Sequence, residues 1–538
     1  MRQSTRLILN TLITYARMGL TVGIGLLVTR KALALLGEGD FGLLATLGAS
    51  GALLLILSDS LTASMQRHLA YEIGQENTEA LRAVFNTALA IFGVAGPVVF
   101  LVGAAIWPLL RPIVDVPEGS ENAVTLVFML TLGNIVAATL ATPFRAYLMA
   151  RQSFGCVAVY ETAQSVLALV AVLLLTMVEN DRLAVYAWLI LGARVGGELI
   201  AVLAAVVMFP DCRPRPWLVR RDQIGRIASF AGWSLVAQMA WRVRVQGSTI
   251  IVNSFYGARV SAAYGVASQL GGYQNQVGAA VWRAVRPAMA TIEGRGGVQG
   301  VKDLTLVSSK YLLLLTLFIL VPFELEMEAL LDLWLKEVPE HTAIVTRLVL
   351  VWMAMFYASQ GYQFAMEAKG SLGRYAMIMA VFDIAVVLTQ LAFLWAMGRG
   401  ADGQPLIGPW LVPAITLGII ALQNVARAWY VGTRIDIPLS RWFGEVLWPT
   451  LLVAAIAGGS AVVPMLLMEQ GWVRLLVTTG VFGVVALPTI WLLGMRRWER
   501  EHFTRVASSG VGLAMRLSGR AVAKEKAASG NGASERGE

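Results

Sequence analysis

Long apolar stretches recur along the whole chain, and short segments with charged, glycine or proline residues separate them. A helix needs about 20 mostly apolar residues to cross the hydrocarbon core of a bilayer. The pattern therefore predicts fourteen membrane-spanning helices, with no extramembrane segment long enough for a soluble catalytic domain. The predicted spans cover residues 8–29, 42–64, 84–110, 123–144, 155–177, 184–209, 228–253, 261–282, 305–323, 342–362, 375–397, 408–430, 446–468 and 475–494.

Composition agrees with a polytopic membrane protein of the all-α class. Hydrophobic residues make up 57% of the 538 residues and charged residues only 14%, whereas a soluble domain has about 25% charged residues. The chain has 2 cysteines, too few for a disulfide framework, and it contains neither a phosphate-binding Walker motif nor a His-Glu-x-x-His motif. We therefore expect no enzyme active site, no metal site and no bound cofactor.

The distribution of basic residues predicts the orientation. An even number of spans places both termini on one side, and the loops and termini of that side contain 27 lysines and arginines, against 8 in the opposite loops. Cytoplasmic loops carry such an excess of basic residues. We therefore predict a multi-pass protein of a cytoplasmic membrane with both termini in the cytoplasm. The net charge of +9 lies in these loops and in the tail rather than on one folded face, so we do not expect nucleic acid as a partner.

Two short segments indicate an internal repeat. Residues 150–155 read Ala-Arg-Gln-Ser-Phe-Gly and residues 368–373 read Ala-Lys-Gly-Ser-Leu-Gly, at an offset of 218. Residues 41–42 (Phe-Gly) similarly resemble residues 264–265 (Tyr-Gly). Because six spans separate the copies, both have the same orientation, which predicts two six-helix lobes related as a parallel repeat. Chance similarity between membrane segments is the alternative.

The repeat predicts how the chain is divided. We expect an N-terminal six-helix lobe at 1–209, a cytoplasmic inter-lobe linker at 210–226 and a C-terminal six-helix lobe at 227–432. Transmembrane helices 13 and 14 follow at 433–495, and a basic cytoplasmic tail at 496–538. We expect the first part of this tail to lie as a helix on the anionic inner leaflet and its end to be disordered.

Three arginines near the middle of predicted spans, Arg17, Arg242 and Arg244, have no acidic residue one helical turn away. An arginine at the centre of a membrane costs roughly 2.5–3.5 kcal/mol on insertion scales, so it persists mainly where it faces water, a partner or an anion. We predict that Arg17 and Arg242 line a polar cavity for a negatively charged solute. Arg244 lies on a different helical face and is expected to have a partner of its own.

Amide side chains continue these polar faces. Gln238 and Gln246 lie one turn before and one turn after Arg242 on the seventh span, and Gln269 and Gln276 lie on the eighth. In hydrocarbon such side chains need hydrogen-bond partners. The first and seventh spans are equivalent in the two lobes, so we interpret these faces as walls of one shared cavity. Hydrogen bonding between helices without transport is the alternative.

Four acidic residues lie within the predicted spans: Asp59, Glu161, Glu198 and Asp383. We expect Glu198 to form a same-helix ion pair with Arg194, one turn earlier, which makes Arg194 a weaker candidate for binding substrate. The other three are candidates for binding a coupling proton or sodium ion, and Asp383 is the best of them. The alternative for Asp383 is a salt bridge to an arginine such as Arg427.

A short motif lies at the junction of the first two spans. Residues 36–43 read Leu-Gly-Glu-Gly-Asp-Phe-Gly-Leu, and they are followed by Leu57, Ser58, Asp59, Leu61 and Arg67. This pattern resembles the N-terminal region of polysaccharide repeat-unit flippases, the Wzx type of the multidrug/oligosaccharidyl-lipid/polysaccharide (MOP) exporter superfamily. The connection at 151–155 also fits, and the resemblance covers roughly 1–440.

The resemblance implies a V-shaped cavity lined by spans 1, 2, 7 and 8. It also implies a cargo, a polyprenyl-pyrophosphate-linked oligosaccharide that moves by alternating access from the cytoplasmic to the outer leaflet of a bacterial inner membrane. Arg17 and Arg242 would contact the pyrophosphate, and the four glutamines would lie nearer to the sugar. Coupling to a Na⁺ or H⁺ gradient stays open, and membrane lipids and other polysaccharide-assembly membrane proteins are the implied partners.

Three alternatives remain from the sequence. A lipid II flippase of the same superfamily would share the fold and the anionic cargo. A multidrug exporter of that superfamily would bind organic cations and should prefer acids in its cavity, whereas the spans contain 7 basic and 4 acidic residues. A polytopic glycosyltransferase or ligase would normally present a sizeable outer loop with catalytic residues, and none is present.

Overall fold

The computed structural model describes residues 3–112, 114, 121–151, 153–294, 297–369, 372–398, 405–501 and 504. Each of the fourteen predicted spans matches helical segments of this part of the chain to within three residues at its ends, so the all-helical membrane fold is confirmed. Of the described segments, 11 are helical, long and apolar enough to cross a membrane.

The first lobe begins with α1, which is 72 residues long and contains the first two predicted spans. The two spans meet at Gly37, whose φ of 78° lies in the left-handed region. Glycine adopts this region without the steric penalty that a Cβ would bring. The helices of this lobe are α1 (Gln3–Gly74), α2 (Thr78–Leu110), α3 (Glu121–Ala150), α4 (Phe154–Leu174) and α5 (Arg182–Met208).

The second lobe repeats this plan. Its first helix, α6, is 74 residues long, contains the seventh and eighth predicted spans and bends at Gly257, where φ is 84°. The helices of this lobe are α6 (Arg221–Gly294), α7 (Val298–Leu325), α8 (Met327–Trp334), α9 (Thr342–Phe356), α10 (Gln360–Ala368), α11 (Leu372–Ala396), α12 (Leu411–Ile435) and α13 (Leu439–Trp442). Each of the two predicted lobes thus begins with a long bent helix, and the parallel repeat stays a prediction.

The bends also define the register of the repeat. Gly37 and Gly257 are 220 residues apart, close to the offset of 218 that the sequence predicts. An offset of 220 residues places residues 41–42 opposite residues 261–262. The predicted match of residues 41–42 to residues 264–265 would need an offset of 223 and stays a prediction.

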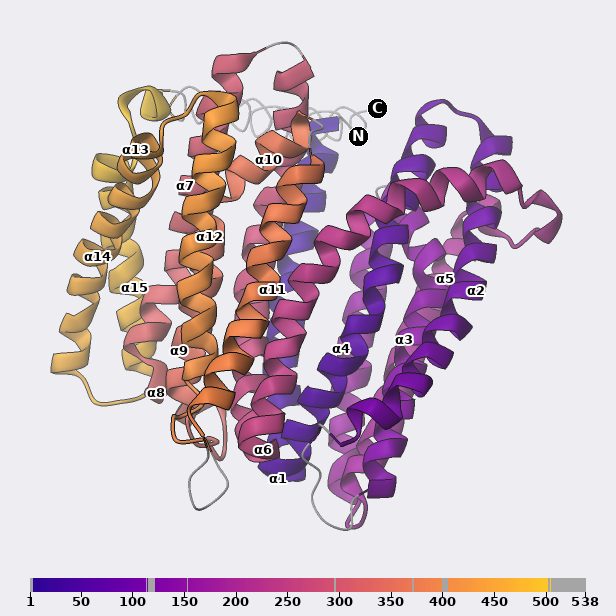
Figure 1. Cartoon of the computed structure of the whole chain (residues 1–538), viewed down its shortest axis with the longest axis horizontal. Helices are drawn as coiled ribbons and strands as arrows, with labels where there is room; N and C mark the ends of the chain where they lie inside the picture. Colours follow the sequence, from indigo (N-terminus) through magenta and orange to yellow (C-terminus); the bar gives the residue numbers. More distant parts are fainter. Residues whose placement is uncertain are drawn as a thin grey trace, which may run out of the picture. The chain divides into compact units, whose positions relative to one another are not determined.

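The two lobes meet where α1 and α6 lie side by side (Figure 1). Gly42 approaches the backbone of Ala258 so closely that a Cβ at Gly42 would overlap the Ala258 carbonyl. One turn further on, the Thr46 hydroxyl donates to Ser261 Oγ at 3.3 Å. Both contacts lie just after the bends, so α1 and α6 are in close contact near the middle of each helix, where the chain turns back.

The linker between the lobes is held against the first lobe. Asp211 accepts hydrogen bonds from Arg82 Nε on α2 at 2.7 Å and from Arg151 Nη2 at 3.4 Å. The side-chain oxygen of Asn86 on α2 also accepts from the backbone N–H of Arg215 at 2.5 Å. These contacts attach the linker to α2 and to the end of α3. The linker therefore packs with the predicted first lobe, and the predicted second lobe begins with α6.

Residues 443–538 form a separate compact unit, and residues 1–442 form the other. The smaller unit contains α14 (Trp448–Leu467) and α15 (Trp472–Thr489), which pack against each other. An ion pair of 2.7 Å between Arg496 Nη2 and Glu445 Oε1 ties the end of this helix pair to its beginning. Most of the predicted tail, from residue 505 onward, lies outside the described residues.

The contact at Gly42 generates a prediction. Because a side chain at this position would push against the backbone of Ala258, Gly42→Val should lower stability by about 1–3 kcal/mol, the usual effect of overpacking, and should lower the thermal midpoint of the purified protein in detergent. Gly23→Ala on the same helix is the matched control, since its Cβ would have no neighbour within 4 Å. If the Gly42→Val protein had the same thermal midpoint as the Gly23→Ala protein, this result would contradict the close approach of α1 and α6.

Candidate functional site

A cavity of about 420 Å³ lies between α1, α6 and α9, and we call it the central cavity. Aromatic side chains form much of its wall: Trp241, Tyr264, Trp352 and Phe356. Amides and hydroxyls lie among them: Gln246, Thr249, Ser268, Gln269 and Asn275. Among the described residues that line the cavity there is no acidic side chain. The chemistry of this wall suits a ligand with both apolar faces and hydroxyl groups.

The structure separates the four predicted glutamines. Gln246 and Gln269 line the central cavity, whereas Gln276 is exposed and is not part of its wall. The side chain of Gln238 lies outside the described side chains. Gln269 also joins the lobes, because its Nε2 donates to the carbonyl of Gly25 on α1 at 3.2 Å and its Oε1 accepts from the Thr29 hydroxyl.

The two arginines predicted to bind the cargo have protein partners. Arg17 forms an ion pair with Glu161 of α4, so it is compensated from another helix although no acid lies one turn away on its own helix. Arg242 Nη1 donates to the backbone carbonyl of Ala52 at 3.3 Å, which links α6 to α1 across the lobes. Sequence spacing detects a partner only on the same helix, and for this reason it missed both contacts.

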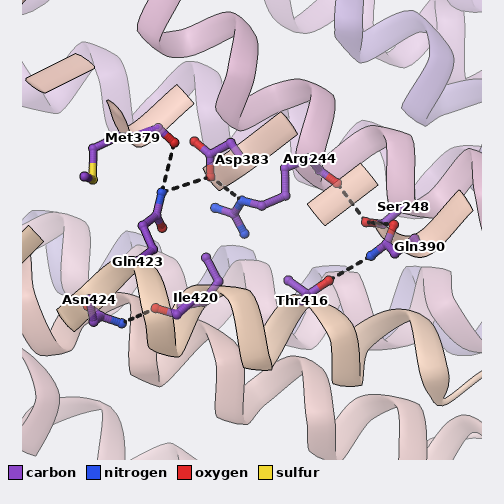
Figure 2. Close-up of polar contacts among 9 residues, drawn as sticks. All are labelled: Arg244, Ser248, Met379, Asp383, Gln390, Thr416, Ile420, Gln423 and Asn424. Atoms are coloured by element: carbon purple, nitrogen blue, oxygen red, sulfur yellow. Dashed lines mark hydrogen bonds and ion pairs between the residues drawn. The ribbon is translucent and has the colours of Figure 1, made fainter. Parts of the chain in front are cut away.

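The third mid-span arginine belongs to a buried network in the second lobe (Figure 2). Arg244 Nε donates to Asp383 Oδ1 at 2.8 Å, and its side chain is 1% exposed. Gln423 Nε2 donates to the same carboxylate oxygen at 3.3 Å, so α6, α11 and α12 meet at this pair. The structure confirms that Arg244 has its own partner and that Asp383 forms a salt bridge, but with Arg244 rather than with Arg427.

A second branch of this network runs along the same helices. The Ser248 hydroxyl, one turn beyond Arg244, donates to Gln390 Oε1 at 3.1 Å, and Gln390 Nε2 donates to Thr416 Oγ1 at 2.9 Å (Figure 2). The Arg244 guanidinium also lies over the ring of Trp352, 5.0 Å from its centroid, in a cation–π contact. Trp352 lines the central cavity, so the buried pair lies directly behind the cavity wall.

These pairs bear on the three candidates for ion coupling. Asp383 and Glu161 each hold an arginine, so a sodium ion at either carboxylate would have to displace a guanidinium. The side chain of Asp59 lies outside the described side chains. We find no group of three or more metal-ligating side chains within the described part of the chain.

A second cavity of about 460 Å³ lies within the first lobe, and we call it the N-lobe slot. It is lined mainly by one face each of α1, α3 and α5. Arg194 and Glu198 of α5 line it, but Glu198 Oε1 forms its ion pair with Arg145 Nη1 of α3 at 3.1 Å. The predicted same-helix pair of Arg194 and Glu198 is therefore replaced by a pair between helices. Arg145 was missed because it follows the predicted span 123–144 by one residue.

Solved structures with a similar fold were found, although no protein-family model and no curated protein matches the sequence. The inward-facing conformation of a multidrug resistance MATE family transporter of the MOP superfamily is 14% identical, with a TM-score of 0.62, over 79% of this chain and 95% of that chain. The lipid II flippase MurJ in its inward closed conformation is 11% identical, with a TM-score of 0.64, over 90% of this chain and 98% of that chain. The chain has the fold of MOP transporters.

The buried network generates a prediction about stability. Removing one partner of a buried ion pair leaves an uncompensated charge and costs about 3–5 kcal/mol. Asp383→Ala and Arg244→Ala should each lower the thermal midpoint in detergent strongly, and the double variant Arg244→Met/Asp383→Leu should regain most of the loss. Arg497→Ala, which breaks an exposed pair with Glu501, is the control and should have little effect. Single variants as stable as the control would contradict the pairing.

Proposed function

We propose that the protein is a flippase that moves a polyprenyl-pyrophosphate-linked oligosaccharide from the cytoplasmic to the outer leaflet by alternating access. The central cavity carries this proposal, because its wall combines Trp241, Trp352 and Phe356 with the amides of Gln246 and Asn275. Flat aromatic rings can pack on the apolar faces of sugar rings, while amides exchange hydrogen bonds with hydroxyl groups.

The charge around the cavity supports an anionic cargo rather than a cationic one. No acidic side chain is among the described residues of the cavity wall, whereas a multidrug exporter for organic cations should present one. Arg242 is not a lining residue of either cavity, but its sequence neighbour Trp241 lines the central cavity and its hydrogen-bond partner Ala52 lines the N-lobe slot. We assign Arg242 to the pyrophosphate because it adjoins residues of both cavities.

A lipid II flippase is the second candidate. The fold similarity to the lipid II flippase MurJ extends over 90% of this chain, and its lipid-linked cargo would place a similar diphosphate and sugar in the same cavity. The two functions differ in the lipid-linked intermediate that should accumulate when the protein is lost, so one experiment separates them.

Depletion of the protein in its native cells should cause a polyprenyl-pyrophosphate-linked oligosaccharide to accumulate on the cytoplasmic leaflet. Mass spectrometry of extracted lipids identifies the intermediate, and labelling of the two membrane faces locates it. Re-expression of the wild type should clear it, whereas Arg242→Ala should lower the rate of export about tenfold or more, because a charge-assisted hydrogen bond is worth about 1.5–3 kcal/mol. Arg347→Ala is the charge-matched control. Accumulation of lipid II would support the second candidate, and no accumulation would contradict both.

A further inference from the structure

The N-lobe slot contains three polar groups without a full set of partners. Glu198 Oε2 and Asn134 Oδ1 are buried and accept no hydrogen bond from the described residues, and the Glu198 side chain is only 7% exposed. Arg194 lines the same slot; it is exposed rather than buried, and it makes no hydrogen bond within the described part of the chain. Buried polar atoms normally have partners, so the two unused acceptors at this cavity point to a ligand.

The charges of the slot do not cancel. Arg145 is fully engaged, because its Nη1 contacts Glu198 and its Nη2 donates to the carbonyl of Ala138 at 3.0 Å and to Thr142 Oγ1 at 3.1 Å. This arginine therefore neutralises Glu198 and holds its carboxylate in place. Arg194 is the remaining charge at the slot, and its exposed guanidinium is accessible to an anion.

We propose that the N-lobe slot binds a glycosyl phosphate, meaning a phosphate ester that carries a hydroxyl-rich ring. Arg194 binds the phosphate group, and hydroxyl groups of the adjoining ring donate to Glu198 Oε2 and Asn134 Oδ1. A phosphate alone would leave these two acceptors unused, and a sugar alone would leave Arg194 unpaired. The assignment rests on the proposed function in one respect, since it identifies the ligand as the sugar-phosphate part of the lipid-linked cargo.

The position of the slot connects it to the central cavity. Ala45 of α1 and Gly265 of α6 line both cavities, so these two small residues form the partition between them. A Cβ on Gly265 would lie 2.9 Å from Ala45 Cβ, which shows how thin and close-packed the partition is. A cargo whose sugar-phosphate lies in the slot can therefore extend its outer sugars toward the aromatic wall of the central cavity when the lobes separate along this seam.

Binding to the purified full-length protein in detergent tests the site without relying on transport. Isothermal titration calorimetry compares three probes: a short-chain prenyl pyrophosphate that carries one hexose, the same prenyl pyrophosphate without the hexose, and UDP-glucose as a soluble glycosyl phosphate. Arg194→Gln should weaken the two prenyl probes about 10-fold to 100-fold, the equivalent of one charge-assisted hydrogen bond, and Arg194→Lys should restore most of the affinity. Asn134→Leu should weaken the hexose probe and leave the sugar-free probe unchanged.

The controls separate binding from folding and identify the source of the ligand. Arg347→Ala removes an equal charge outside the slot and should bind like the wild type, and the thermal midpoint of each variant reports its folding. Weak binding of UDP-glucose assigns the site to the lipid-linked cargo, whereas equal binding assigns it to a soluble nucleotide sugar. Wild-type protein that binds no probe, or Arg194→Gln that binds all probes normally, overturns the site. The depletion phenotype is measured separately, so the proposed function can stand if this site fails.

Discussion

The cost of placing a charge in hydrocarbon governs the interior of this protein. Three arginines in the helices each pair with a carboxylate on another helix: Arg17 with Glu161, Arg145 with Glu198, and Arg244 with Asp383. Such pairs are expensive to break, so each one holds its two helices together. The described contacts between the lobes at Gly42, Thr46 and Arg242 are instead close packing and hydrogen bonds, which water or a ligand can replace at lower cost.

This division between strong contacts within lobes and weaker contacts between them is what a carrier with two rigid halves requires. The bends at Gly37 and Gly257 allow α1 and α6 each to cross the lobe twice and to present small residues at the seam. The central cavity and the N-lobe slot lie next to this seam and share Ala45 and Gly265. A separation of the lobes along the seam would therefore change access to both cavities together.

The sequence predicted the helices well, because long apolar runs are a local signal. It identified most of the charged residues that form ion pairs, but it missed Arg145 and assigned the partners poorly. Arg194 and Glu198 are one turn apart, yet Glu198 pairs with Arg145, because helix packing and not sequence spacing brings those two groups together. No sequence signal marks the aromatic wall, since Trp352 and Phe356 have the spacing of ordinary core residues until the fold shows that they face a cavity.

Transport by the purified protein is the most direct test of the account. The protein is reconstituted into liposomes that contain a fluorescent polyprenyl-pyrophosphate-linked oligosaccharide, and a membrane-impermeant reagent that modifies the glycan measures how much of the cargo lies in the outer leaflet over time. The account predicts that cargo shielded in the inner leaflet becomes accessible much faster than in protein-free liposomes, and that a cationic multidrug substrate is not moved. Cargo movement at the protein-free rate, in liposomes where the protein is folded and inserted, would contradict the account.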